Sequence, residues 1–386
     1  MRISAVETYS LKLSADAAYL GQLGDGTDPP AGYAVRPPWR SIYSDRYETL
    51  LVRLVAEDGT SGWGEALAPV APEVPAAIVD LLLGPVLIGK PALAPRPVFA
   101  ALRDLMRERG HLVGHQADAL AAVDIALWDL AGKLTGLPVA TLLGGAFRDA
   151  VPSYVSGLPR PDDEGRAALG AEWASRGAKA VKLHLGNGVA TDLSTVDAVR
   201  EAAPALRIAV DAHWAYSVDE ALALAAGLAA RGCWFLEAPL APEDIAGHAE
   251  LTSRATIPVA VGETLRNRFE FAQWLTARGL RIAQPDVART GITEAMAIAE
   301  LCTAAHVPVA PHHSVGLGVA LAAGVHVSAA VEGLAAFEYQ PTSFTVGQRL
   351  LTEPLAVHPA GFPVPTGPGL GIDIDAETVA RLSKES

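Results

Sequence analysis

The sequence predicts an α/β protein in which a closed barrel of parallel strands follows a smaller α+β domain. From about Val151 onward, short apolar or β-branched runs alternate with long stretches rich in Ala, Leu and Arg. Strands that alternate with helices pair in parallel, and eight such units close into a barrel. Acidic residues stand directly after successive runs, where a barrel places its functional groups. The first third of the chain lacks this rhythm.

The barrel strands are short runs that recur at regular spacing, each followed by a helix-length stretch. The eight runs cover residues 151–154, 180–183, 207–210, 233–236, 259–261, 282–283, 307–310 and 336–339. Eight units over about 200 residues favour a (β/α)8 barrel, and a doubly wound open sheet is the alternative. The apolar stretch 315–331 is interrupted by a histidine and by small residues, so we interpret it as a buried helix rather than a membrane span.

The first domain is predicted from antiparallel strands followed by helices. A hairpin turn at Glu57-Asp58-Gly59 joins two of the strands. The predicted strands cover residues 2–9, 49–56 and 61–65, and the predicted helices cover 96–109 and 116–133. We place this domain at residues 1–130 and the barrel at 131–355. The Gly- and Pro-rich tail, 356–386, breaks the βα rhythm and is expected to pack back on the first domain.

Composition excludes several functional classes. The 386 residues are 50% apolar and 19% charged, which is typical of a globular protein rather than a disordered chain. Thirty basic against 43 acidic residues give a net charge of −13, which argues against a nucleic-acid partner or an anionic membrane surface. The N-terminus lacks a signal-peptide pattern, and the two cysteines lie far apart in apolar runs, so we expect a cytoplasmic protein without disulfides.

Three successive strands end in a carboxylate: Asp211, Glu237 and Glu263. They are spaced by one βα unit each, so the barrel brings them to neighbouring positions at its carboxyl-terminal face. Three anions that close repel one another unless a divalent cation lies among them. Ligation by oxygen alone favours Mg2+ over zinc. The sequence therefore predicts a magnesium site.

Basic side chains surround this predicted site. Lys182 and His184 share one face of the second strand because side chains alternate with a period of two. His213 follows the first ligand by two residues on the same face. Asp286 follows the sixth strand and His312 the seventh, so an Asp/His pair is expected, in which the carboxylate fixes the tautomer of the imidazole.

Two further positions complete the candidates. The eighth strand supplies Glu338. His313 stands beside His312, and the sequence leaves open which of the two points inward.

In these residues the chain resembles the mandelate racemase/muconate lactonizing branch of the enolase superfamily. The resemblance extends from SGWGEALAP near Gly62, through DIALWDLAGKLTGLPVATLLGG, to PGLGIDID near the C-terminus. It implies a modified (β/α)7β barrel under an α+β capping domain that the C-terminal tail completes. It also implies a homo-oligomer, and a bound Mg2+ that stabilises the enediolate formed when a base removes the proton next to a substrate carboxylate.

The resemblance assigns roles residue by residue. Asp211, Glu237 and Glu263 match the metal ligands, and Asp286 with His312 matches the Asp/His dyad. Glu338 matches the glutamate that assists the substrate carboxylate. The family's Lys-x-Lys matches Lys182-Leu183-His184, so Lys182 is expected to neutralise the substrate carboxylate while His184 replaces the usual catalytic lysine.

That replacement weakens the case for racemisation, which needs comparable bases on both faces of the α-carbon. A second departure places His213 where relatives carry asparagine, as in some acid-sugar dehydratases, whose histidine takes part in proton transfer.

The reaction expected first is dehydration of an acid sugar to a 2-keto-3-deoxy acid, with His312 as base and a histidine as acid. The alternatives through the same enediolate are cycloisomerisation of an aldarolactone and racemisation or epimerisation of a 2-hydroxy acid. A barrel metallohydrolase needs histidine-rich ligation, which the three carboxylates argue against. A metal-binding barrel without catalysis would not exchange an α-proton with solvent.

Substrate specificity is expected in a flap at residues 21–38 and in a second capping segment at 67–74, because loops that close over a barrel contact the distal end of the substrate. Arg40 and Tyr43 are the substrate-binding candidates there, with Asp25 and Arg36 as further polar residues. The expected partner is a small carboxylate.

Overall fold

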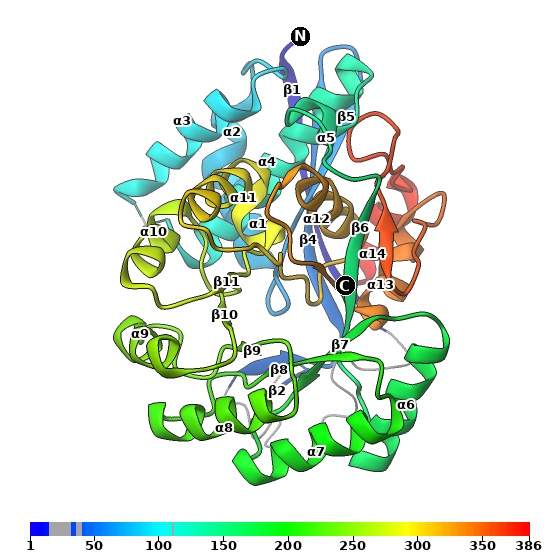
Figure 1. Cartoon of the computed structure of the whole chain (residues 1–386). Helices are drawn as coiled ribbons and strands as arrows, with labels where there is room; N and C mark the ends of the chain where they lie inside the picture. The colour runs from blue at the N-terminus through cyan, green and yellow to red at the C-terminus, as the bar shows by residue number, and fades with distance from the viewer. Residues whose placement is uncertain (15–31, 36–40, 110–111) are drawn as a thin grey trace.

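The structure is a computed structural model that describes residues 1–14, 32–35, 41–109 and 112–386. An antiparallel sheet with its helices, blue and cyan in Figure 1, lies against a barrel whose surrounding helices run from green to orange. Within these described residues, no helix has both the length and the apolar character to cross a membrane.

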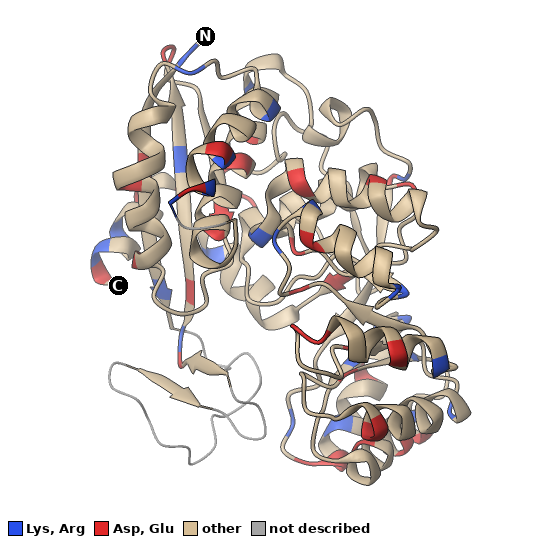
Figure 2. Cartoon of the chain, turned by 90° about the vertical axis from the view of Figure 1, so that its left-hand side faces the viewer, with Lys and Arg blue, Asp and Glu red and all other residues tan. Residues whose placement is uncertain are grey.

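The capping domain is built on a three-stranded antiparallel sheet. Its strands lie in the order β1 (Ile3–Leu13), β4 (Tyr47–Ala56) and β5 (Ser61–Ala66), and the turn between β4 and β5 confirms the predicted hairpin. A second hairpin, β2 (Tyr33–Val35) with β3 (Ile42–Ser44), extends beyond the end of this sheet (Figure 2). The helical segments are α1 (Glu73–Ile78), a π-helical turn at Val79–Leu83, α2 (Gly84–Leu87), α3 (Pro95–Arg107), α4 (Gly114–Thr135) and α5 (Val139–Leu142).

Helix α4 lies between the sheet and the barrel, which explains why every residue from Ala117 to Gly132 is buried. Gly62 and Gly64 on β5 allow the close approach, since a Cβ at either position would overlap the backbone of α4. On its other side α4 packs against α11 of the barrel. The predicted domain boundary at residue 130 falls inside this helix, and it remains a prediction.

The barrel confirms the predicted fold class. Its parallel strands follow one another around the sheet, and the last pairs with the first to close it. The strands are β6 (Ala150–Ser156), β7 (Ala180–His184), β8 (Arg207–Asp211), β9 (Leu236–Glu237), β10 (Val259–Val261), β11 (Ile282–Ala283) and β12 (Phe337–Tyr339). The helices between them are α6 (Asp163–Ser175), α7 (Val189–Ala202), α8 (Val218–Ala230), α9 (Ile245–Arg254), α10 (Arg268–Ala277), α11 (Val287–Ala304) and α12 (Gly318–Ala330).

The predicted bounds of two strands were wrong. The seventh run, 307–310, makes only isolated bridges from Val309 to its neighbours on both sides, because Pro308 and Pro311 have no N–H with which to extend a ladder. The fourth strand begins at Leu236, not at Cys233, whose N–H instead closes the end of α8. The bridges at Val309 still keep the barrel closed in (β/α)7β form.

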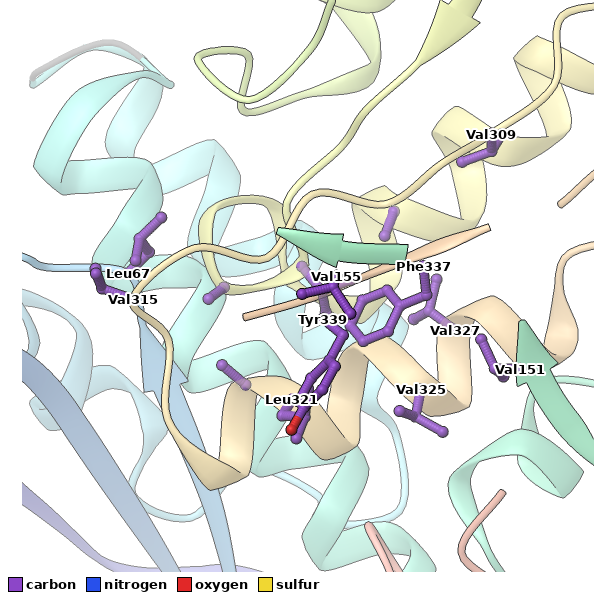
Figure 3. Packing of buried hydrophobic residues seen from close by; sticks show 14 of the residues in the cluster. Leu67, Val151, Val155, Val309, Val315, Leu321, Val325, Val327, Phe337 and Tyr339 are labelled. Atoms are coloured by element: carbon purple, nitrogen blue, oxygen red, sulfur yellow. The ribbon is translucent and has the colours of Figure 1, made fainter. Parts of the chain in front are cut away.

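Side chains along a barrel strand point alternately outward, toward the surrounding helices, and inward, into the barrel. Phe337 and Tyr339 on β12 point outward and pack against α12, as Figure 3 shows around Leu321 and Val325. Glu338, between the two aromatic residues, points into the barrel. The predicted buried helix in 315–331 is confirmed, since every residue of α12 is buried.

The C-terminal tail crosses back over both domains. After α13 (Pro341–Gly347) and a 3-10 turn at Gln348–Leu350, strand β13 (Gly361–Pro363) pairs antiparallel with β6 of the barrel. Leu370 then donates its N–H to Asp129 on α4, and α14 (Ala376–Glu385) packs against β1. The tail therefore completes the capping domain, as expected, and also adds a strand to the barrel.

Candidate active site

The candidate active site is a cavity of about 430 Å³ between the carboxyl-terminal ends of the barrel strands and the capping domain. The barrel contributes His184, Asp211, His213, Trp214, Glu263, Thr264, Arg289, His312, Ser314 and Val315, and the capping domain contributes Ser41, Ile42, Tyr43, Ser44, Arg46, Glu48, Pro69 and Val70. The last two belong to the second capping segment predicted to face the substrate. Arg40 and the flap residues Asp25 and Arg36 lie outside the described residues.

The barrel interior has two layers of side chains. An apolar layer fills the barrel, and a polar layer lies above it, next to the cavity. Ala180, Ala209, Phe235 and Ala336 are among the buried residues of the apolar layer. Two positions after each of these residues come Lys182, Asp211, Glu237 and Glu338, which the period of two turns to the same side. The site residues of four strands therefore form one polar layer.

The three predicted ligands lie at neighbouring strand ends. Asp211 ends β8 and is paired directly with Glu237, which ends β9. Glu263 follows β10 after Gly262, whose φ of 152° and contact with the backbone of Gln284 exclude a side chain at that position. Asp211 and Glu237 are fully buried, and Glu263 lines the cavity.

Lys182 is fully buried between two carboxylates. Its Nζ lies 3.0 Å from each oxygen of Glu237 and 2.7 Å from Oε1 of Glu338. Burial alone would lower the pKa of Lys182, but Glu237 and Glu338 raise it well above its usual value, so the side chain is an ammonium. The expected contact with a substrate carboxylate remains a prediction, since in this structure the ammonium is engaged by the protein itself.

Glu338 is held by donors on several elements. Ser156 Oγ donates to Oε1 at 2.5 Å, and Tyr154 Oη and the backbone N–H of His313 donate to Oε2. Burial would raise the pKa of Glu338, whereas the charge of Lys182 lowers it to about 2. The carboxylate is therefore a fixed anion at the floor of the site.

His312 and Asp286 form the expected pair. Nδ1 of His312 lies 2.7 Å from Oδ2 of Asp286, and Nε2 lies 2.9 Å from Oε2 of Glu263. Burial would lower the pKa of His312, but Glu338, Asp286 and Glu263 raise it well above its usual value. His313 points away, against Phe337, and burial lowers its pKa to about 4. The geometry thus selects His312 over His313.

The other two histidines flank Asp211. His184 Nδ1 lies 3.1 Å from Oδ2 of Asp211, and its Nε2 lies 3.2 Å from Ser156 Oγ. His213 has a φ of 44°, a left-handed conformation in which its N–H bonds back to Oδ1 of Asp211. Nε2 of His213 lies 2.9 Å from the hydroxyl of Tyr43, on the β2–β3 hairpin. A residue of the capping domain therefore reaches the predicted acid group of the barrel.

The donor set fits a divalent cation. One oxygen of Glu263, Oε1, is buried without a hydrogen-bond partner among the described residues. Burial and the charges of Asp211, Glu338 and Glu263 raise the pKa of Glu237 to about 8, despite the opposing effect of Lys182. Atoms of Glu237, Glu263 and His312 lie within 4.8 Å of one another, as the ligands of one ion would. His312 belongs to this cluster, whereas the carboxylate of Asp211 is turned toward His184 and His213, so the assignment of Asp211 as the third ligand stays a prediction.

Several cavity or network residues were not predicted from the sequence, among them Arg289, Ser156 and Gln284. Arg289 lies in the first turn of α11, three residues after Asp286, and lines the cavity. Ser156 ends the first strand, and Gln284, just after β11, donates Nε2 to Glu237 at 2.6 Å. The strand-end rule that found the carboxylates applies equally to Ser156 and Gln284. Arg289 has no such signal, because it is on a helix.

The fold and the site define a barrel enzyme whose acidic pocket, beneath a capping domain, has a donor set that suits a divalent cation. The mandelate racemase/muconate lactonizing enzyme N-terminal domain matches residues 35–144, and the enolase C-terminal domain-like family matches residues 165–379. The chain belongs to the enolase superfamily, in its mandelate racemase/muconate lactonizing enzyme family.

Two relatives with named activities align with most of this chain. It is 36% identical to the D-galactarolactone cycloisomerase of Agrobacterium fabrum, over 89% of this chain and 93% of that protein. It is 30% identical to the arabinonate dehydratase of Saccharolobus solfataricus, over 85% of this chain and 88% of that protein. The relatives thus include both a cycloisomerase and a sugar-acid dehydratase.

Solved structures agree over nearly the full length. A member of the enolase superfamily from Agrobacterium tumefaciens superimposes with a TM-score of 0.93 at 36% identity, covering 98% of each chain. A racemase from Streptomyces coelicolor with bound magnesium superimposes with a TM-score of 0.85 at 25% identity, covering 98% of this chain and 99% of that chain.

Proposed function

We propose that this protein is a Mg2+-dependent enzyme that removes the proton next to the carboxylate of a sugar acid and then eliminates the group on the β-carbon. The observation that carries this proposal is the His312–Asp286 pair, whose imidazole lines the same cavity as Glu263. Asp286 accepts from Nδ1, which leaves Nε2 as the basic atom that faces the cavity.

Asp211, Glu237 and Glu263 would hold the Mg2+. When bound, the ion supplies positive charge against the negative charge that develops on the substrate carboxylate. His312 acts as a base only in its neutral form, so the charge of Glu263 must then be balanced by a cation other than the imidazolium. Lys182 fixes Glu237 and Glu338 through its ammonium and keeps the floor of the site close to electroneutral.

Dehydration requires an acid for the departing hydroxyl, and His213 is the group we assign to it. Its Nε2 meets the hydroxyl of Tyr43 at 2.9 Å, so this imidazole is held at the capping side of the cavity while Nε2 of His312 lies on the barrel side. His184 is held against Asp211 and is the second acid candidate. The product is a 2-keto-3-deoxy acid.

Cycloisomerisation of an aldarolactone is the second candidate, favoured by the 36% identity to a D-galactarolactone cycloisomerase. It shares the first step and differs in the leaving group, which is the ring oxygen of the lactone. A carboxylate leaves more readily than hydroxide and needs no acid.

The test is incubation of the purified protein with Mg2+ and a panel of aldonates, aldarates and aldarolactones in D2O. We expect NMR to show deuterium at the α-carbon or formation of a 2-keto-3-deoxy acid, with both lost in the His312→Asn variant. Absence of exchange across the panel would refute α-proton removal from sugar acids.

A further inference from the structure

Arg289 is a cation on the cavity wall that the mechanism above does not use. It lies in the first turn of α11 and borders the same cavity as Glu263, His213 and His312. Its side chain is mostly buried, and Nε is fully shielded from solvent.

The guanidinium has no partner among the described residues. Nε makes no hydrogen bond, and neither terminal nitrogen forms an ion pair or hydrogen bond there. A buried donor left without an acceptor costs free energy, and the cost is larger for a charged group. A buried arginine without protein partners is therefore expected where a bound ligand supplies the hydrogen-bond acceptor.

Three carboxylates lie near Arg289, and each is engaged elsewhere. Asp118 accepts from Arg266 Nε at 3.2 Å. The two oxygens of Asp286 accept from Ala288 N and His312 Nδ1. Glu263 has one oxygen against His312 and the other in the predicted metal site. Arg266 adds a second guanidinium nearby, and no carboxylate among the described residues accepts a hydrogen bond from Arg289.

The other described cations near the cavity are already satisfied. Lys182 is enclosed by Glu237 and Glu338 beneath the cavity floor. Arg46 is 40% exposed and lies 3.6 Å from Asp45 on the rim. In the part of the chain that the structure describes, Arg289 is the cavity cation with open donors.

We propose that Arg289 binds a second carboxyl group of the substrate, so that the enzyme acts on diacids, either an aldarate or its lactone, in which the second carboxyl is esterified until the ring opens, in preference to monoacid aldonates. This inference rests on the proposed function, in which the first carboxylate is bound at the metal site. The planar guanidinium offers two parallel N–H groups that match a carboxylate, whereas the terminal CH2OH of an aldonate offers one neutral oxygen.

The role of Arg289 differs between the two diacid reactions. In an aldarate the second carboxylate exists throughout, so Arg289 contributes to substrate binding. In a lactone, the electron pair of the broken C–H bond forms the C=C bond, the β-carbon–oxygen bond breaks, and the ring oxygen leaves with its electrons as a carboxylate. No water is released, and the enol product tautomerises to the keto acid. Arg289 then binds a charge that appears only as the ring opens.

The experiment compares the wild type with Arg289→Gln and Arg289→Lys, and with Arg254→Gln as a control that removes the same charge from the surface of α9. The substrates are galactarate, D-galactarolactone and galactonate, which carry the same hydroxyl configuration and differ at one end. We expect Arg289→Gln to lower kcat/KM for the diacids by about 10- to 100-fold, with less than about 3-fold change for galactonate. For galactarate we expect this loss as a higher KM, and for the lactone we expect it as a lower kcat.

Arg289→Lys should retain part of the diacid preference, and Arg254→Gln should match the wild type. An equal loss on diacid and monoacid, or no loss on either, would overturn the proposal.

Binding separates this inference from the proposed function. Calorimetric titration with galactarate and galactonate in the presence of Mg2+ reports the affinity ratio without turnover. We expect the ratio to favour galactarate in the wild type and to fall toward one in Arg289→Gln. A ratio that the substitution leaves unchanged refutes the role of Arg289, even if deuterium exchange proceeds. A ratio that collapses supports it, even if none of the three compounds exchanges and the proposed reaction fails.

Discussion

The carboxylate of Asp124, on α4 of the capping domain, accepts two hydrogen bonds from Thr293 on α11 of the barrel. The backbone N–H and the hydroxyl of Thr293 each lie 2.7 Å from it. Between Asp286 and Thr293, α11 is interrupted at Gly291, whose φ is 75°. A side chain at Gly291 would collide with Asp124. The capping domain therefore holds α11 in place. The first residue of this helix, Val287, directly follows Asp286, the partner of His312.

Removal of this carboxylate should destabilise the protein. In Asp124→Ala the buried N–H of Thr293 has no acceptor, so we expect a loss of about 2–4 kcal/mol in the free energy of unfolding, measured with urea. Thr293→Val loses the hydroxyl bond but keeps the backbone bond, and its loss should be smaller. Equal stability of Asp124→Ala and the wild type would contradict the interpretation.

Asp124 should also make stability depend on pH. Burial raises its pKa to about 7 from a usual value of 3.8. Because the folded pKa is the higher one, the contribution of Asp124 is fully present below about pH 4 and is lost as the pH rises through about 7. As the pH rises over this range, the free energy of unfolding of the wild type should therefore fall relative to that of Asp124→Asn, by up to about 4 kcal/mol. Urea unfolding at several pH values measures it, and a flat difference would show that Asp124 is ionised throughout.

The His312→Asn variant tests whether His312 is the base that removes the α-proton or a ligand of the metal ion. We expect α-proton exchange to fall by about 10²- to 10⁴-fold while Mg2+ affinity, measured by calorimetry, is retained. His313→Asn is the matched control and should still exchange, since His313 lies outside the cavity. Loss of Mg2+ binding in His312→Asn would instead make His312 a ligand together with Glu237 and Glu263.

Asp211→Asn decides the third metal ligand. If Asp211 ligates the ion with Glu237 and Glu263, both Asp211→Asn and Glu237→Gln should weaken Mg2+ binding by at least about 10-fold. Asp286→Asn changes a buried carboxylate that contacts His312 and lies outside the predicted triad, and this variant should bind Mg2+ normally. Wild-type affinity in Asp211→Asn would remove this residue from the triad.

Tyr43→Phe tests the contact between the capping hairpin and His213. Loss of one hydrogen bond to a proton-transfer group should lower kcat/KM by about 10-fold without a large change in melting temperature. Tyr33→Phe alters the same hairpin at a hydroxyl that bonds Glu48 rather than the cavity histidine, and it should have a smaller effect. Similar losses in both variants would indicate that the hairpin is merely loosened.

Strand periodicity explains which parts of the site could be predicted from sequence. Lys182 and Glu338 face inward because their neighbours Val181, Leu183, Phe337 and Tyr339 are apolar and pack outward. The same rule could not choose between His312 and His313, because the preceding prolines leave the seventh run without a regular ladder. There the alternation that assigns faces is absent.

Local pattern by itself determined the barrel, the strand ends that carry Asp211, Glu237 and Glu263, and the buried character of α12. These features depend on residues close together in the chain, whose periodicity reflects which face is buried. Tertiary structure alone decided that Lys182 is enclosed by Glu237 and Glu338, that Tyr43 meets His213, and that Arg289 keeps open donors over the cavity. Each of these depends on side chains brought together from distant elements by closure of the barrel and docking of the capping domain, and no local pattern encodes such a distance.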